Sequence, residues 1–260
     1  MKYILHHDDL PKEVYIGSSI AIDTETTGLN LVRDRLCLIQ ICTEHNEIHL
    51  VKINKNSNSP VIFNILCNDK ILKIFHFARF DLAVLMKQFN CNISNVYCTK
   101  IASKLARTST DNHSLKTLVL NYLSIEIPKF EQTSDWGSLE LSNAQLEYAA
   151  TDVLHLHKLK KILDGILIRE GRDKLAKDMF DFLPKLSFLD LEGWDINSLL
   201  SPKQLNTNYK HRQKHTNHRL GHRPCHLAVG HVFGQWIGCR CCRDGVSNCL
   251  GFHFLEKLER

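Results

Sequence analysis

The chain has no long hydrophobic run, and this lack excludes one broad class of protein. Among its 260 residues, no apolar stretch approaches the roughly 20 residues that an α-helix needs to span a bilayer. The first residues, Met1 to Asp9, turn acidic before the apolar core of a secretory signal could form. We therefore expect a globular protein without a membrane segment, located in the cytoplasm.

The first 200 residues also lack any rhythm of paired cysteines. They hold five of the ten cysteines, mostly inside apolar runs: Cys37, Cys42, Cys67, Cys91 and Cys98. Cysteines scattered in this way are typical of reduced thiols in a core and not of a disulfide framework. The composition, 43% hydrophobic and 23% charged, is that of a globular chain long enough for one large domain, or one domain with an appendage.

Positive charge is scarce in the first part of the chain and concentrated in the last. Residues 201–260 contain 10 Lys or Arg against 3 acids, a balance of +7, so the net charge of +5 leaves 5 − 7 = −2 for the first 200 residues. A slightly acidic domain that approaches a polyanion needs metal ions or local basic patches to offset repulsion.

Short apolar runs alternating with helical patterns predict an α/β protein, a mixed five-stranded sheet flanked by helices. The expected strands are the run around Asp23, residues 35–42, 47–51, 71–75 and 95–98, with 3–5 as a further short candidate. The expected helices are residues 60–67, 76–88, 99–107 and 114–123, a long one opened by a Ser142–Gln145 capping box and continuing to about Ile166, and 172–188.

The most informative stretch runs from Ile20 to Leu29, where an apolar segment ends in two acids and a glycine turn. Asp23 and Glu25 are two positions apart, so in a strand their side chains point to the same face. Two carboxylates held together at the end of a buried strand repel each other, and a bound divalent cation would relieve that repulsion. The pair predicts a Mg2+ or Mn2+ site, and the alternative is a strand that simply leaves the core there.

Two further acids and a tyrosine strengthen the metal interpretation. Asp81 follows a predicted strand at the start of a helix, where ligands gather at the strand ends of α/β sheets. Asp152 lies in an otherwise apolar helical segment, and a carboxylate is expensive to bury there unless it is paired or metal-bound. Tyr148 precedes Asp152 by four residues and so shares its helix face. The four acids with this tyrosine form a much more specific pattern than any one of them.

The pattern resembles the DEDD-type 3'-5' exonucleases of the tyrosine-bearing (DEDDy) subclass, and bacterial ribonuclease D in particular. The similar motifs are Asp23-Thr-Glu25-Thr-Thr-Gly-Leu29, His76-Phe-Ala-Arg-Phe-Asp81 and Tyr148-Ala-Ala-Thr-Asp152. The segment Gln132-Thr-Ser-Asp-Trp136 resembles ribonuclease D specifically. Phe77 stands where many members of the family have Asn, so one polar contact near the substrate is missing. The resemblance covers residues 1–195, which we expect to be the exonuclease domain.

This resemblance implies a ribonuclease H-like fold and a two-metal mechanism. Its implied metal ligands and catalytic acids are Asp23, Glu25, Asp81 and Asp152. They would hold two divalent ions, Mg2+ or as a substitute Mn2+. The implied role of Tyr148 is to orient and help deprotonate the attacking water. The expected reaction is hydrolysis of phosphodiester bonds from the 3' end of RNA, releasing nucleoside 5'-monophosphates.

The resemblance also implies contacts to the terminal nucleotide and a class of substrate. Thr26 and Leu29 would bind that nucleotide, with Leu29 packing on the last base, and His76 and Phe80 are further candidates; for Leu29 and Phe80 a core role is the alternative. The expected partners are single-stranded RNA 3' ends, including tRNA precursors, in RNA processing or turnover. A 3'-5' DNA exonuclease, or a catalytically silent nucleic-acid-binding module on the same fold, stays open, as does the oligomeric state.

Residues 196–260 form a basic tail rich in histidine and cysteine. Between residues 201 and 260 there are seven His and five Cys, but the paired Cys-x-x-Cys and His-x3-5-His units of a zinc site are absent as a set. Three interpretations stay open: a poorly ordered extension, which we expect, a basic arm that holds RNA phosphates, and a zinc site. The zinc site would draw on Cys225, Cys239, Cys241, Cys242 and Cys249 with His222, His226 or His231.

Overall fold

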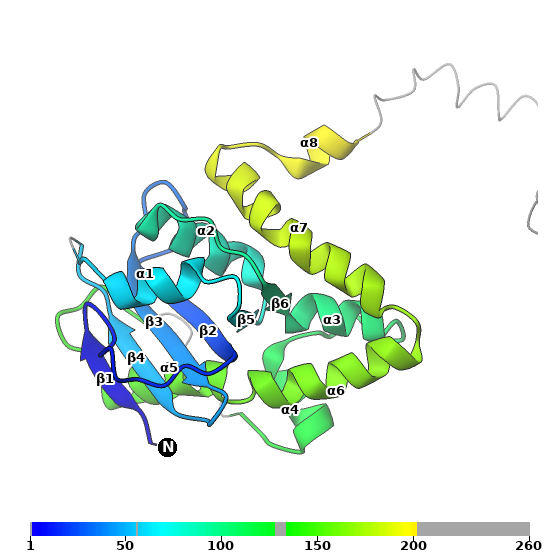
Figure 1. The fold of residues 1–260 in the computed structure, drawn as a ribbon, viewed down its shortest axis with the longest axis horizontal. Coiled ribbons are helices and arrows are strands. Elements are labelled where there is room, and N and C mark those ends of the chain that lie inside the picture. Colours follow the sequence, from blue (N-terminus) through cyan, green and yellow to red (C-terminus); the bar gives the residue numbers. More distant parts are fainter. Residues whose placement is uncertain (1, 56, 128–133, 202–260) are drawn as a thin grey trace, which may run out of the picture. The chain divides into compact units, whose positions relative to one another are not determined.

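A six-stranded mixed sheet forms the centre of the computed structural model, which describes residues 2–55, 57–127 and 134–201 (Figure 1). The strands are β1 (Ile4–His7), β2 (Ser19–Thr26), β3 (Leu36–Thr43), β4 (Ile48–Lys52), β5 (Leu72–Phe75) and β6 (Val96–Cys98). Their order across the sheet is β1-β4-β3-β2-β5-β6. The pairs β2–β3 and β3–β4 are antiparallel, whereas β1–β4, β2–β5 and β5–β6 are parallel. The predicted mixed sheet is confirmed.

The predicted count of five strands is wrong by one, because β1 joins the sheet at its edge. Ile4 pairs with His49 and His7 with Lys52, in parallel. Both apolar side chains of this strand, Ile4 and Leu5, are exposed. Its place therefore depends on backbone hydrogen bonds to β4 and not on a buried face, and this is why hydrophobic patterning indicates the strand only weakly.

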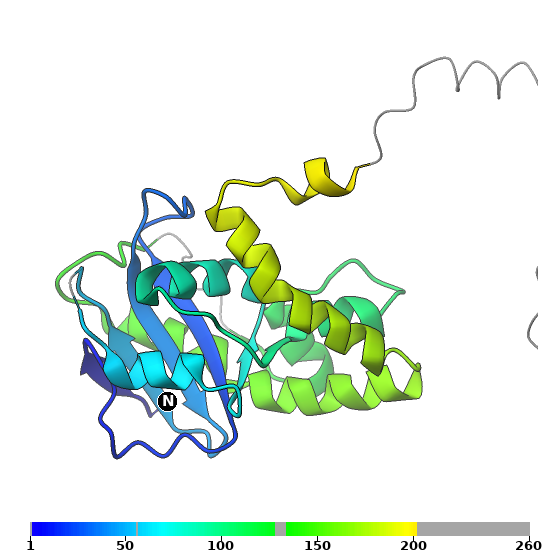
Figure 2. The ribbon, with the colours of Figure 1, turned by 45° about the horizontal axis from the view of Figure 1, so that its top comes forward.

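Eight helices lie among the described residues. They are α1 (Pro60–Cys67), α2 (Ala78–Phe89), α3 (Thr99–Ala106), α4 (Leu115–Leu123), α5 (Asn143–Leu154), α6 (Leu156–Arg169), α7 (Asp173–Leu191) and α8 (Ile196–Leu200). Helix α5 packs on β2, β3 and β4, α2 packs on α7, and α3 packs on α6. Figures 1 and 2 show α5 on one face of the sheet and α1 and α2 on the other. No helix in the described ranges is both long and apolar enough to cross a bilayer.

The predicted long helix is two helices, divided at His155. The capping box at its start is confirmed: Ser142 Oγ accepts from the Gln145 backbone N–H at 3.2 Å, and Gln145 Oε1 accepts from the Ser142 N–H at 2.9 Å. At His155 the backbone turns to φ −100° and ψ −3°. The apolar spacing continues through both helices, from Leu146 to Leu163, so periodicity alone did not show the bend.

The short length of β5 opens the sheet on one side of β2. Strand β5 pairs with β2 only from Ser19 to Ala21. The later residues of β2 therefore have no strand neighbour on that side, and the chain leaves β5 into the start of α2. This is the arrangement at the carboxyl ends of strands where ligands bind in α/β folds.

Helix α8 lies beyond residue 195, where the sequence predicted the start of the tail. The predicted zinc site, basic arm and disordered extension concern residues 202–260, which lie outside the described part of the chain.

Candidate active site

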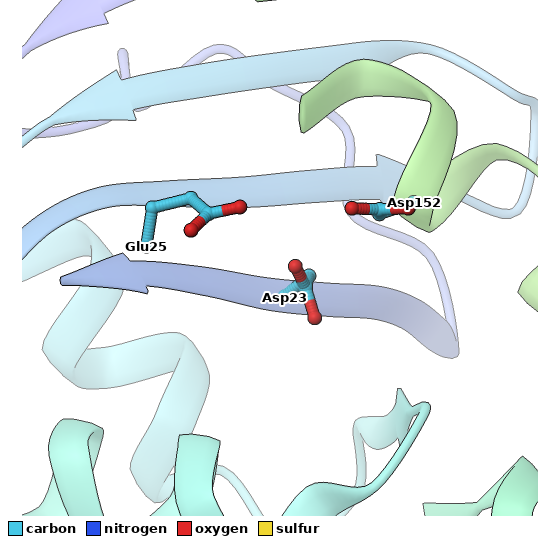
Figure 3. Close-up of side chains that lie close together, drawn as sticks. All are labelled: Asp23, Glu25 and Asp152. Atoms are coloured by element: carbon cyan, nitrogen blue, oxygen red, sulfur yellow. The ribbon is translucent and has the colours of Figure 1, made fainter. Parts of the chain in front are cut away.

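Strand β2 and helix α5 bring three acids together. Asp23 and Glu25 project from the same face of β2, and Asp152 reaches them from α5 (Figure 3). One carboxylate oxygen from each of these residues lies within 4.8 Å of the other two. Oxygen atoms that converge at this separation are the ligands that Mg2+ and Ca2+ prefer. The three carboxylates therefore fit a divalent cation.

Asp81, the remaining predicted ligand, lies outside this group of three. It occupies the first turn of α2, is buried, and accepts a hydrogen bond of 2.6 Å at Oδ1 from the Thr24 hydroxyl. Thr24 points to the opposite face of β2 from Asp23, since side chains alternate along a strand. Asp81 still lines the same cavity and its charge acts on Asp23. The structure thus places it beside the cluster and not within it.

Burial raises the pKa of each acid in this site. For Glu25, burial and then the charges of Asp152 and Asp81 raise the pKa to about 8. For Asp23, burial and the neighbouring carboxylates raise the pKa well above its ordinary range. Burial also raises the pKa of Asp152 to about 7, against a hydrogen bond from Tyr148 that lowers it. These shifts reflect the cost of burying charge and, for Asp23 and Glu25, of placing carboxylates together, and a bound cation would offset that cost.

Without a cation, these acids should make the folded chain less stable as pH rises. The pKa of Glu25 goes from an ordinary 4.5 to about 8, so between these values the unfolded chain binds fewer protons than the folded one. The free energy of unfolding therefore falls across this window, by on the order of 5 kcal/mol for one such acid. Melting of the chelator-treated chain between about pH 5 and about pH 8 measures it.

A variant and an added cation test whether the decline in stability with pH comes from these acids. Glu25→Gln should flatten the decline, because the amide does not titrate. Added Mg2+ should raise the melting temperature most at the alkaline end, where the carboxylates are ionised. A melting temperature that rises with pH in the chelated chain would contradict the assignment of repelling acids.

Tyr148 lies against the cluster on α5. Its hydroxyl is hydrogen-bonded to Asp152, and burial and the neighbouring carboxylates raise its pKa. The Trp136 ring packs nearby, with 6.3 Å between ring centroids. The phenol is thus neutral and is fixed in place by a carboxylate and an indole ring. Trp136 belongs to the predicted ribonuclease D-like segment, of which Gln132 and Thr133 lie outside the described residues.

A cavity of about 930 Å³ opens over the acids. All four predicted nucleotide-binding residues line it: Thr26, Leu29, His76 and Phe80. Leu29 is 83% exposed, which excludes the alternative core role for that side chain. Phe80 is half-buried and packs against the core, so it contributes to the cavity wall and also to the core. The Thr26 hydroxyl donates to the Gly28 carbonyl at 2.6 Å and holds the turn that presents Leu29.

His76 is neutral and has a defined tautomer. Its Nδ1 lies 2.9 Å from the Thr99 hydroxyl oxygen, and that hydroxyl donates its only hydrogen to the Phe75 carbonyl. Nδ1 must therefore carry the proton and donate to Thr99, which leaves Nε2 as an acceptor. Burial, and then the charge of Lys100, lower the pKa of His76 to about 3. His76 can thus accept a hydrogen bond from a hydroxyl group.

Several residues that sequence reasoning did not assign to the site also line the cavity, among them Phe77 and Lys100. Phe77 is 52% exposed and adopts φ 71°, a left-handed conformation that is strained for a bulky residue. The Lys100 Nζ lies 4.0 Å from the centre of its ring. The sequence marked Phe77 only as a departure from the family motif, and nothing local to Lys100 on α3 signalled its position.

The fold and the acid cluster define this protein as a nuclease of the ribonuclease H-like class. Residues 6–168 match the sequence profile of the 3'-5' exonuclease family, which is more than half of the chain. The chain belongs to the 3'-5' exonuclease family. This family depends on divalent metal ions, and the cluster of three acids fits that requirement.

Individual relatives differ in length and in name. Ribonuclease D of Gluconacetobacter diazotrophicus is 30% identical over 161 residues, which cover 62% of this chain and 41% of that protein. DNA polymerase I of Aquifex aeolicus is 32% identical over 177 residues, 65% of this chain and 29% of that one. The chain therefore spans less than half the length of these curated relatives.

The structure of Brucella melitensis NrnC bound to pGG matches over nearly its whole length. It is 48% identical, has a TM-score of 0.72, and the match covers 75% of this chain and 98% of that one. Another structure of the same protein contains bound Mg2+. The resemblance to an exonuclease of the ribonuclease D type is confirmed by these comparisons.

Proposed function

We propose that this chain is a 3'-5' exoribonuclease that depends on two divalent cations. It would hydrolyse phosphodiester bonds from RNA 3' ends and release nucleoside 5'-monophosphates. The observation that carries the proposal is the convergence of Asp23, Glu25 and Asp152 within 4.8 Å at the base of a large cavity. Half-buried carboxylates held this close, with no basic partner in the group, are costly unless they bind a cation.

The proposed metal ligands are Asp23, Glu25, Asp81 and Asp152. Mg2+ is the expected ion, with Mn2+ as a substitute, because all the donors are carboxylate oxygens. Cations held there would supply Lewis-acid chemistry, which would activate water and stabilise negative charge on the phosphate.

The chain's own residues place the substrate and the water. Leu29 offers an exposed apolar contact to the terminal base, and His76 Nε2 accepts from a ribose hydroxyl. The Tyr148 hydroxyl, held by Asp152, orients the water that attacks the last phosphorus. The bond from that phosphorus to the 3' oxygen of the preceding nucleotide breaks, and this oxygen takes up a proton.

The size of the substrate is a further part of the proposal. NrnC, whose structure holds pGG, a 5'-phosphorylated dinucleotide, is matched over 98% of its length. We therefore place short oligoribonucleotides, down to pGG, among the substrates. Processing of tRNA precursors and a cytoplasmic location stay predictions.

The test is a degradation time course on 5'-labelled single-stranded RNA, matched DNA and pGG, each with Mg2+, with Mn2+ and with chelator. We expect RNA to shorten from its 3' end and pGG to be cleaved to mononucleotides, with both reactions abolished by chelator. The ratio of kcat/KM for pGG and for longer RNA gives the preferred length.

A 3'-5' DNA exonuclease is the second candidate function. It is favoured by the 32% identity to DNA polymerase I of Aquifex aeolicus. The same acids can cleave RNA or DNA, and discrimination between the two substrates depends on contacts to the 2'-hydroxyl. Faster shortening of the DNA would establish this candidate. Retained binding without shortening of any substrate would instead indicate a silent binding module.

Lys100 should bind substrate phosphate and contribute little to the chemical step. Replacing it by methionine removes one charge from the cavity wall, and a charge-assisted hydrogen bond to phosphate is worth roughly 1.5–3 kcal/mol. We expect Lys100→Met to raise KM about tenfold with kcat changed less than about threefold. The matched control is Lys104→Met, one turn further along α3, where the side chain is exposed outside the cavity. Equal effects of both variants would show only a general loss of positive charge.

A further inference from the structure

Gln40 is a fully buried amide without a hydrogen-bond partner. It lies in the middle of β3 with 0% of its surface exposed. Neither its amide nitrogen nor its amide oxygen is hydrogen-bonded to any described residue. Buried polar groups are nearly always hydrogen-bonded, because an unpaired amide in a core loses its hydrogen bonds to water and gains none in exchange. Such a residue therefore needs an explanation from its surroundings.

The sheet register places Gln40 directly beside a predicted metal ligand. Gln40 pairs with Asp23 of β2 on one side and with Leu50 of β4 on the other. Residues directly opposite in antiparallel strands share a face, with Cβ atoms about 4.5–5.5 Å apart. Along β3 itself, the neighbours on this face are Leu38 and Cys42.

Asp23 is the one acid among those four neighbours. Leu38 and Leu50 are apolar, and the Cys42 thiol donates to the Thr43 carbonyl. Helix α5 packs over this part of the sheet. Besides the site residues Tyr148 and Asp152, its buried side chains are Leu146, Ala149, Ala150, Val153 and Thr151, whose hydroxyl donates to the Glu147 carbonyl. A glutamine side chain is long enough to reach the Asp23 carboxylate after rotation about its side-chain bonds.

We propose that Gln40 is a positioning residue for the metal centre, whose amide nitrogen donates a hydrogen bond to the Asp23 carboxylate when that carboxylate holds a divalent cation. This inference rests on the proposed metal-dependent function. Residues that orient a metal ligand in this way commonly change metal affinity 10- to 100-fold when they are removed.

A neutral amide suits this task better than a charged donor. A lysine or arginine at the same place would neutralise the carboxylate and compete with the cation for it. The amide fixes the orientation of one oxygen and leaves the negative charge available to the metal. In the structure Gln40 makes no bond to a described residue, so its loss should not weaken the fold itself.

The test compares Gln40→Met with Leu50→Met in the full chain. Both variants place methionine on the same sheet face, at paired positions of β3 and β4, but only the first removes the amide. Mn2+ binding is followed by electron paramagnetic resonance, and melting is followed separately in chelator. We expect Gln40→Met to weaken Mn2+ binding about tenfold and to melt in chelator no lower than the parent. Leu50→Met should bind Mn2+ within about twofold of the parent.

The possible outcomes distinguish a failure of this inference from a failure of the proposed metal-dependent function. Parent affinity in Gln40→Met, or an equal loss in Leu50→Met, overturns the positioning role while the proposed metal site stands. Failure of the parent chain to bind Mn2+ overturns both. If Gln40→Met does not fold, Gln40→Leu is measured in its place. Lower melting of both variants in chelator, with parent Mn2+ affinity, assigns Gln40 to packing alone and also overturns the inference.

Discussion

Asp23→Asn should abolish turnover and, in chelator, should stabilise the chain. The amide keeps the shape of the side chain but removes the charge that a cation needs, so we expect kcat/KM to fall on the order of 10³-fold or more, about 4 kcal/mol of transition-state stabilisation. The same change removes one of the mutually repelling carboxylates whose pKa values burial raises. The melting temperature in chelator at about pH 8 should therefore rise or stay level.

A carboxylate elsewhere in the fold provides the control. Asp164 on α6 forms an ion pair with Lys160, with 2.6 Å between the charged atoms, and lies outside the cavity. Asp164→Asn makes the same chemical change without touching the cluster, and it should leave kcat/KM unaltered. An Asp23→Asn variant that keeps activity within about tenfold of the parent would remove this acid from the metal centre.

Tyr148→Phe should slow the chemical step more than it weakens binding. The variant keeps the ring beside Trp136 and loses only the hydroxyl that is bonded to Asp152. Positioned proton-transfer groups contribute typically about 10²–10⁴-fold, so we expect kcat to fall by roughly 10²-fold while KM changes little. Single-turnover rates at saturating Mg2+ measure the step directly.

A second tyrosine provides the control for the slower chemical step expected of Tyr148→Phe. Tyr122 lies on α4, outside the cavity, with Arg107 5.6 Å from the centre of its ring. Tyr122→Phe removes a hydroxyl that does not line the cavity, and its kcat should match that of the parent. An unchanged single-turnover rate in Tyr148→Phe would exclude the phenol from the mechanism, leaving it a packing role against Trp136.

The sequence by itself determined the local parts of this protein. Alternation along a strand placed Asp23 and Glu25 on one face, and the four-residue spacing placed Tyr148 beside Asp152, because both periods are properties of the backbone. Apolar runs likewise predicted most strands and helices. The same periodicity missed the bend at His155, since the buried stripe continues through it.

Only the tertiary structure decided which groups meet. It brought Asp152 close to Asp23 and Glu25 of β2. Asp81 instead lies beside this cluster, where it accepts a hydrogen bond from Thr24. The tertiary structure also placed Lys100 in the cavity and Gln40 next to Asp23. These neighbours come from different strands and helices, whose register and packing depend on the whole core. No pattern local to either residue encodes such a contact, whereas the acids show themselves because a buried charge is unusual in an apolar segment.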